Sequence, residues 1–144
     1  MIAVDTNILV YAHRTDSPFH ERARSAVETL ASGVRGWAIP WPCAHEFFAV
    51  VTHPRIFKTA TPAEAAFAQL RALGTLANLA FIGEADEYLQ HLESLALPAQ
   101  TRGGAIHDAR IAAICVSHGV AELWSADRDF SRFPQIVVRN PLIG

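Results

Sequence analysis

Lysine, cysteine and long apolar runs are scarce or missing in this chain, and positive charge is not in excess. Lys58 is the single lysine among twelve basic residues, and the formal net charge is -2, so no overall positive field indicates nucleic-acid binding. No segment approaches the roughly 18 consecutive apolar residues of a membrane span. No basic segment precedes the short apolar run at the N-terminus. We therefore expect no membrane association, no signal peptide and a cytoplasmic location.

The two cysteines and seven histidines also lack the spacing of metal-binding sites. Cys43 and Cys115 lie in apolar segments far apart in the chain, which favours free thiols in the core of a protein from a reducing compartment. The histidines show no HExxH-like pairing, so a zinc site is not expected.

Apolar residues dominate what is present, with 51% hydrophobic and 18% charged residues over 144 positions. This composition suits one ordered domain spanning residues 1–144. Short apolar runs predict strands ending at Asp5 and at 36–40, 78–82, 120–124 and 136–138. Helical patterns begin near residues 6, 18, 42, 62, 84 and 105. The alternation predicts a three-layer α/β fold with a parallel sheet.

Local signals add detail to these helices. The segment Thr61–Glu64 has the form of a capping box with proline at the first helical position. Glu84, Asp86 and Glu87 are predicted to occupy the first turn of a helix, where its dipole favours negative charge. The three tryptophans flank strand regions, so we expect them in the core rather than at a base-binding surface.

The stretch from Ile2 to Val10 carries Asp5 between two apolar runs. A buried carboxylate requires a cation, hydrogen-bond donors or a raised pKa. If the strand belongs to a parallel sheet, Asp5 lies at the edge where such sheets bind ligands. The alternative interpretation is that Asp5 caps a helix that begins at Thr6, and the stretch alone leaves both interpretations open.

Four carboxylates stand where a solvated charge is not expected. Asp5 and Asp127 each follow an apolar strand, and Glu46 and Asp108 lie early on predicted helices. All four can point toward one edge of the sheet, where they would repel one another without a counter-charge. Oxygen ligands of this kind suit Mg²⁺ or Mn²⁺, and such an ion activates water against a phosphodiester.

Each of these residues also has a structural interpretation. Glu46 can be a surface residue, Asp108 can complement a helix dipole, and Asp127 can cap a turn. Asp129 is assigned to a turn or to a supporting role behind the metal ligands. Neutral oxygens beside Asp5 and Asp127 would come from Asn7 and Ser125.

An ordered set of motifs along the whole chain resembles the PIN domain, and most closely a small VapC-type toxin. The motifs are Asp5-Thr6-Asn7-Ile8-Leu9-Val10, Pro42 with Glu46, His107-Asp108-Ala109 with Ile111-Ala112-Ala113, and Ser125-Ala126-Asp127-Arg128-Asp129-Phe130. Each motif alone is weak, but their order and spacing are specific. Ser125 is a mild departure, since the family more often has threonine there.

The resemblance implies a five-stranded parallel sheet and a metal-dependent endoribonuclease that cleaves RNA. It implies an acidic site formed by Asp5, Glu46, Asp108 and Asp127, with Asn7 and Ser125 in support. It also implies a homodimer and control by a VapB-type antitoxin as protein partner.

Other classes fit less well. His107-Asp108 is similar to a motif of the HD phosphohydrolases, but those proteins are all-helical and need further histidine ligands. A receiver-like phospho-acceptor module would need paired acids at the first strand and a late lysine, which this chain lacks. The remaining alternative is a non-catalytic PIN-like binding or scaffold protein, which has no need of all four acidic residues.

Overall fold

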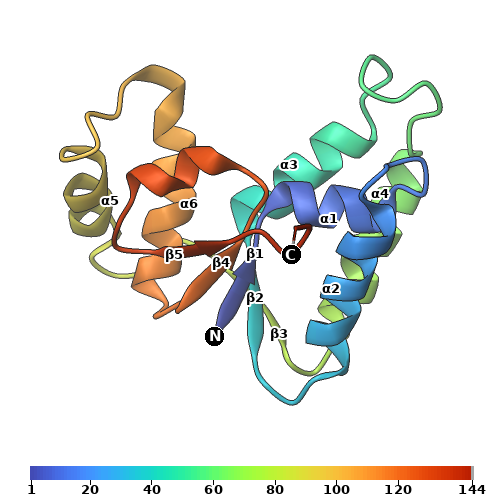
Figure 1. Cartoon of the computed structure of the whole chain (residues 1–144), viewed down its shortest axis with the longest axis horizontal. Coiled ribbons are helices and arrows are strands. Elements are labelled where there is room, and N and C mark those ends of the chain that lie inside the picture. The colour runs from blue at the N-terminus through green and yellow to red at the C-terminus, as the bar shows by residue number, and fades with distance from the viewer. Residues whose placement is uncertain (144) are drawn as a thin grey trace.

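The computed structural model describes residues 1–143 and contains one parallel sheet of five strands. The strands stand in the order β3-β2-β1-β4-β5. They are β1 (Ile2–Val4), β2 (Trp37–Pro40), β3 (Leu79–Ile82), β4 (Glu122–Trp124) and β5 (Val137–Arg139). β1 and β4 are neighbours in the middle of the sheet (Figure 1). The residues that follow these two strands therefore meet at one edge.

Six α-helices flank the sheet: α1 (Thr6–His13), α2 (His20–Ser32), α3 (Trp41–Val51), α4 (Ala63–Gly74), α5 (Tyr88–Ala96) and α6 (Ile106–Ser117). In Figure 1 the ribbons of α5 and α6 lie to the left of β1 and β2, and those of α2 and α4 lie to the right. Two short 3-10 helices, η1 (Gly103–Ala105) and η2 (Arg128–Arg132), complete the elements. The predicted three-layer α/β fold and its five-stranded parallel sheet are confirmed.

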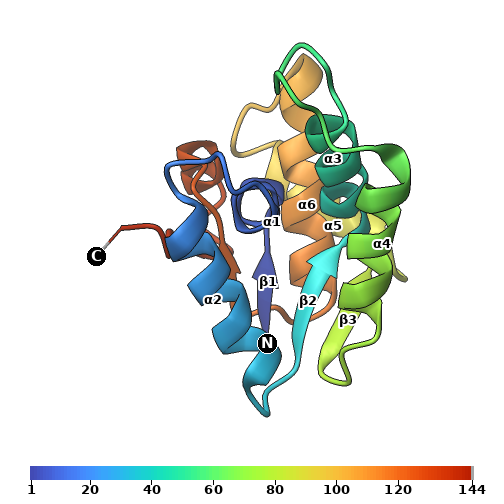
Figure 2. The same ribbon diagram turned by 90° about the vertical axis from the view of Figure 1, so that its right-hand side faces the viewer.

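The sequence places apolar residues where this packing needs them. β2 is buried along its whole length, and α6 buries a nearly continuous run from Ile111 to Cys115 against the core. Pro42 lies in the first turn of α3, where its missing N–H costs nothing. Gly119 follows α6 with a φ of 67°, a conformation that glycine adopts readily. Figure 2 shows β1 and β2 running in the same direction, so α1 and α3 begin at the same end of the sheet.

Two predicted helix starts are wrong in their details. Pro62 is the N-cap of α4, and the Thr61 hydroxyl contacts His13 and Arg14 instead of closing a capping box. α5 begins at Tyr88, so its first turn contains no acidic residue. Glu87, in the left-handed conformation at φ 64°, precedes that helix. In both cases a contact or turn outside the helix outweighed the local signal.

The tryptophans are also not all in the core. Trp37 and Trp124 are buried as expected, but Trp41 is 45% exposed. Its indole stacks on Phe81 of β3 with ring centroids 4.5 Å apart, at the start of α3. Among the described residues, no helix combines the length and apolar character needed to cross a membrane.

Candidate active site

Asp5 lies immediately after β1, and its carboxylate is only 4% exposed. Its Oδ1 accepts a hydrogen bond of 2.8 Å from the Thr6 backbone N–H and lies 3.5 Å from the Cys43 thiol, which donates to it. Its Oδ2 accepts a 2.6 Å hydrogen bond from the Ser125 hydroxyl. Burial raises the pKa of this carboxyl, and the hydrogen bonds, led by that from Ser125, lower it. The carboxylate is therefore held in one orientation at the carboxyl end of the central strand.

Ser125 connects the first carboxylate to the last part of the site. It follows β4 and is 2% exposed. While its hydroxyl donates to Asp5, its oxygen accepts a 2.9 Å hydrogen bond from the Asp127 backbone N–H. Asn7 supports the same turn, because its side-chain oxygen accepts a 3.2 Å hydrogen bond from the Ala126 N–H. The turn after β4 is thus tied to the turn after β1.

Glu46 reaches the site from the middle of α3. The Thr6 hydroxyl donates a 2.9 Å hydrogen bond to its Oε2, across forty positions of sequence. Thr6 is nearly buried at the start of α1, whereas Glu46 is exposed. Thr6 therefore orients the exposed Glu46 beside the buried Asp5.

Three further carboxylates form a cluster at the other side. Asp108, in the first turn of α6, meets Asp127 and Asp129, with one oxygen of each lying within 4.8 Å of the others. The Asp129 N–H donates a 2.8 Å hydrogen bond to Asp127 Oδ1. Burial, followed by repulsion from the carboxylates of Asp127, Asp5 and Asp129, raises the pKa of Asp108 to about 6.

One groove of about 340 Å³ is lined by four of these carboxylates, together with Thr6 and Asn7. The four are those of Asp5, Glu46, Asp108 and Asp127. Arg132 contacts Asp129 at 3.8 Å, but one guanidinium does not neutralise the five acidic residues gathered here. Hard oxygen donors at this spacing fit Mg²⁺ or Mn²⁺ and not a soft metal. The Cys43 thiol does not alter this fit, because burial and Asp5 raise its pKa well above the usual value and keep it protonated.

A family model of the PIN domain matches residues 2–136, nearly the whole chain. The chain belongs to the PIN-domain family. The resemblance inferred from the ordered motifs is therefore confirmed.

Relatives of this PIN domain match it over almost its entire length. It is 33% identical to Ribonuclease VapC48 of Mycobacterium tuberculosis (strain CDC 1551 / Oshkosh), with 97% of each protein covered. Its fold is similar to a chain of VapBC2 from Rickettsia felis bound to a promoter DNA fragment, with a TM-score of 0.70 at 21% identity over 97% of this chain and 98% of that one. It is also similar to Mycobacterium tuberculosis VapC20, described as a sarcin-ricin loop cleaving toxin, with a TM-score of 0.65 at 22% identity over 95% and 99% of the two chains.

In this PIN domain four carboxylates lie together in one groove, as the sequence predicts: those of Asp5, Glu46, Asp108 and Asp127. Asp5 is also the N-cap of α1, so its two proposed roles are compatible. Asp129 lies in the turn after β4, as predicted, and one of its carboxylate oxygens also lies within 4.8 Å of those of Asp108 and Asp127. The sequence signal for this proximity is the spacing of two residues, because Asp127 caps η2 and its carboxylate accepts a hydrogen bond from the Asp129 N–H.

The sequence does not identify Thr6 as a residue that supports the site, although Thr6 directly follows Asp5. Its hydrogen-bond partner lies on another helix, and no sequence pattern connects the two. Cys43 was assigned to the core, which is correct, but its thiol also contacts the buried carboxylate.

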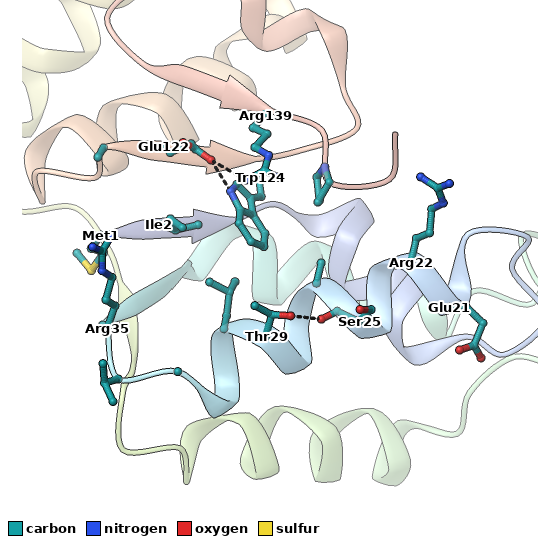
Figure 3. A pocket seen from close by; sticks show the side chains of 17 residues that line it. Met1, Ile2, Glu21, Arg22, Ser25, Thr29, Arg35, Glu122, Trp124 and Arg139 are labelled. Carbon is teal, nitrogen blue, oxygen red and sulfur yellow. Dashed lines mark hydrogen bonds and ion pairs between the residues drawn. The ribbon is translucent and has the colours of Figure 1, made fainter. Parts of the chain in front are cut away.

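The PIN domain has a second and larger cavity of about 770 Å³ between α2 and the sheet (Figure 3). Figure 3 shows the Trp124 indole directed into it and Thr29 of α2 on the opposite wall. Its lining includes three arginines and two glutamates: Arg22, Arg35, Arg139, Glu21 and Glu122. Within residues 1–143, the only group of three acidic, histidine or cysteine side chains at metal-binding spacing is the one formed by Asp108, Asp127 and Asp129.

Proposed function

We propose that this PIN domain is a metal-dependent endoribonuclease and the toxin of a type II toxin–antitoxin pair. The observation that carries the proposal is the convergence of Asp5, Glu46, Asp108 and Asp127 in one groove. The names of its relatives support RNA as the substrate class, since VapC48 is called a ribonuclease and VapC20 a toxin that cleaves the sarcin-ricin loop. We place this activity on RNA in the cytoplasm.

The divalent ion would be held by Asp108, Asp127 and Asp129 on one side and by Asp5 directly or through water. When bound, Mg²⁺ or Mn²⁺ lowers the pKa of water and screens the negative charge of the phosphate. Asp5 is kept in position by Ser125 and by the Thr6 N–H. The pKa of Asp108 is raised first by burial and then by repulsion from neighbouring carboxylates, and a cation relieves this repulsion.

Glu46 would accept the proton of the attacking water. Its carboxylate lies in the groove, and the hydrogen bond from Thr6 orients it. The reaction is hydrolysis: the water oxygen bonds to phosphorus, one P–O ester bond breaks, and the leaving oxygen takes up a proton. A carboxylate positioned within reach of the reacting water contributes to such a step as general base.

The proposed partners are an antitoxin of the VapB type and a second copy of the chain in a homodimer. The similarity to a chain of the VapBC2 complex supports the first of these. An antitoxin segment with basic or aromatic side chains would complement the acidic groove. Recovery of the chain with a small protein encoded next to it would test this partnership.

The deciding experiment is digestion of total cellular RNA by the purified protein, free of antitoxin, with Mg²⁺ or Mn²⁺ and with a chelator. Discrete fragments are expected only with the metal. Asp5→Asn is expected to abolish cleavage, because the amide cannot supply the negative charge, while its oxygen still caps α1. Asp86→Asn, the same change at an exposed position outside the groove, is the matched control and is expected to cleave normally.

Full activity of Asp5→Asn would remove Asp5 from the mechanism. If the folded wild-type protein binds the metal and leaves RNA intact, the non-catalytic scaffold becomes the better description. Circular dichroism of each variant shows whether the fold is retained.

A further inference from the structure

The groove is lined by apolar as well as acidic side chains. We call the apolar residues that come from α1, from α3 and from the loop after α3 the apolar wall: Val10, Tyr11, Val50, Ile56 and Phe57. Tyr11 comes from α1, and Ile56 and Phe57 come from the loop between α3 and α4. Ile56 is 54% exposed. Tyr11, Val50 and Phe57 also pack against the core, and holding a metal ion does not need apolar surface, so the exposed part of the wall is available to a further ligand.

The loop that carries the wall is held firmly against α1. Thr61 is 8% exposed, and its hydroxyl accepts a 3.2 Å hydrogen bond from the Arg14 guanidinium and lies 3.1 Å from His13 Nε2. The Thr61 N–H donates a 2.8 Å hydrogen bond to the Val51 carbonyl. These contacts close the loop at its base and fix its path.

The aromatic ring of the wall is also positioned in advance. The Arg14 guanidinium lies over the Phe57 ring, 4.1 Å from its centroid, and is itself held by Asp16 through hydrogen bonds of 2.6 and 2.9 Å. Such cation–π contacts orient an aromatic side chain. Arg14 therefore covers one face of the Phe57 ring and fixes its position, while the ring also lines the groove, which lowers the entropy cost of a contact between the ring and a ligand.

A nucleotide matches this division of the groove, because its base is flat and apolar on its faces and its phosphate is charged. Proteins that bind single-stranded RNA stack unpaired bases on aromatic side chains. The volume of about 340 Å³ is near the lower end of ligand pockets, which span roughly 300–1,000 Å³. Arg55 and Lys58 flank the apolar pair Ile56-Phe57 on the exposed loop, where they can contact neighbouring phosphates.

We propose that the wall formed by Tyr11, Ile56 and Phe57 receives one unstacked base of single-stranded RNA, next to the phosphate that is cleaved. The inference rests on the proposed ribonuclease function. It makes Phe57 a residue that positions the substrate, and it predicts that paired RNA is bound poorly, because a stacked duplex does not release a base into the groove.

The test measures binding separately from cleavage. The protein carries Asp5→Asn to prevent hydrolysis, and Mg²⁺ is present. Fluorescence anisotropy gives Kd for a mixed-sequence single-stranded RNA and for an abasic RNA of the same length. The intact RNA is expected to bind roughly tenfold more tightly than the abasic RNA.

Phe57→Leu, added to the same protein, keeps an apolar side chain but removes the aromatic face. It is expected to weaken binding of intact RNA by roughly tenfold and to leave binding of abasic RNA unchanged. Ile56→Ala is a second variant at an exposed position, for which the same pattern with a smaller loss is expected. Phe67→Leu is the matched control, because Phe67 is a half-exposed aromatic residue of α4 outside the groove.

A wild-type protein that cleaves RNA while Phe57→Leu leaves the preference for intact over abasic RNA unchanged would overturn the inference alone. A protein that shows the base preference and its loss in Phe57→Leu, but no cleavage, would contradict the proposed function and keep the base site. Loss of antitoxin binding in Phe57→Leu with unchanged RNA binding would assign the wall to a protein partner instead.

Discussion

The acidic groove and the cavity between α2 and the sheet differ in what surrounds their charged side chains. The larger cavity, about 770 Å³, has mostly exposed charges with local partners: Arg139 lies over the Trp124 ring at 5.4 Å and 4.0 Å from Glu122. The groove of about 340 Å³ contains the buried Asp5 and a cluster in which carboxylates face carboxylates. The smaller site is the one in which burial and repulsion raise carboxyl pKa values.

The comparison also follows the direction of the strands. The groove contains Asp5 and Asp127, which follow β1 and β4, whereas the larger cavity extends along these strands from Met1, Ile2 and Glu122 at their beginning to Trp124 at the end of β4. Ligand sites in parallel sheets lie at the carboxyl ends. Cavity size is therefore a poorer indicator of function here than uncompensated charge at the carboxyl edge.

The largest expected difference between the two cavities is in the effect of replacing a serine that lines or supports each of them. Ser125→Ala removes the donor to the buried Asp5 and the acceptor for the Asp127 N–H. We expect cleavage to fall by roughly 10–100-fold, as for other residues that orient metal ligands. The unmatched buried groups should also cost about 1–3 kcal/mol of unfolding free energy, measured by denaturant titration.

Ser25→Ala is the matched control on α2, where Ser25 lines the larger cavity. It should change neither cleavage nor stability measurably. Equal effects of the two substitutions would show that the groove has no special dependence on its hydrogen bonds.

A second matched pair of substitutions, at Thr6 and Thr29, is expected to have a smaller effect on cleavage. Thr6→Val is nearly isosteric and removes the hydrogen bond to Glu46. Because Glu46 is the proposed base, kcat should fall roughly tenfold while KM stays the same, and Thr6→Ser should restore it. Thr29→Val, in which the lost hydroxyl bonds only to the Ser25 carbonyl on the same helix, should leave kcat unchanged. A change in KM alone for Thr6→Val would point to substrate contact rather than to positioning of Glu46.

Sequence reasoning succeeded where a rule connects residues distant in the chain. Asp5 and Asp127 both follow predicted strands, and the carboxyl ends of parallel strands share an edge, so their proximity could be predicted. Glu46 and Asp108 lie early on predicted helices, so they could point toward the same edge, and the ordered family motifs supported this placement. The local sequence around each residue also fits a surface carboxylate.

The missed features depend on tertiary contacts. The hydrogen bond between Thr6 and Glu46 joins two helices, and a helical pattern does not give the rotation of one helix relative to another. Glu84 was assigned to a helix dipole, but it forms an ion pair with Arg110 of α6, which lowers its pKa. The apolar wall was also not foreseen, because Phe57 lies in a loop whose path depends on Thr61 and Arg14.

The smallest predicted effect is on the stability of the metal-free protein. The pKa of Asp108 is about 6 in the folded chain and near 3.8 in the unfolded chain, so folding penalises the ionised form. The penalty is fully present above about pH 6 and is relieved as the pH falls from 6 toward 3.8, and both states hold the proton only well below pH 3.8. Asp108→Asn removes the penalty on the ionised carboxylate. After allowance for solvent screening we expect a gain of roughly 1 kcal/mol in unfolding free energy, which corresponds to a Tm about 3 °C higher at pH 7.5.

The difference in Tm between this variant and the wild type should shrink between pH 6 and pH 4, measured by thermal unfolding in the presence of a chelator. With added Mn²⁺ at pH 7.5, the wild type should have the higher Tm. The ion stabilises the folded wild type, whereas Asp108→Asn lacks one of the carboxylates proposed to bind it. Asp86→Asn should show neither behaviour, since its carboxylate is exposed and lies outside both cavities. A stabilisation by Asp108→Asn that is constant from pH 7.5 to pH 4 would instead assign the effect to packing, and it would remove carboxylate repulsion as the property that separates the groove from the larger cavity.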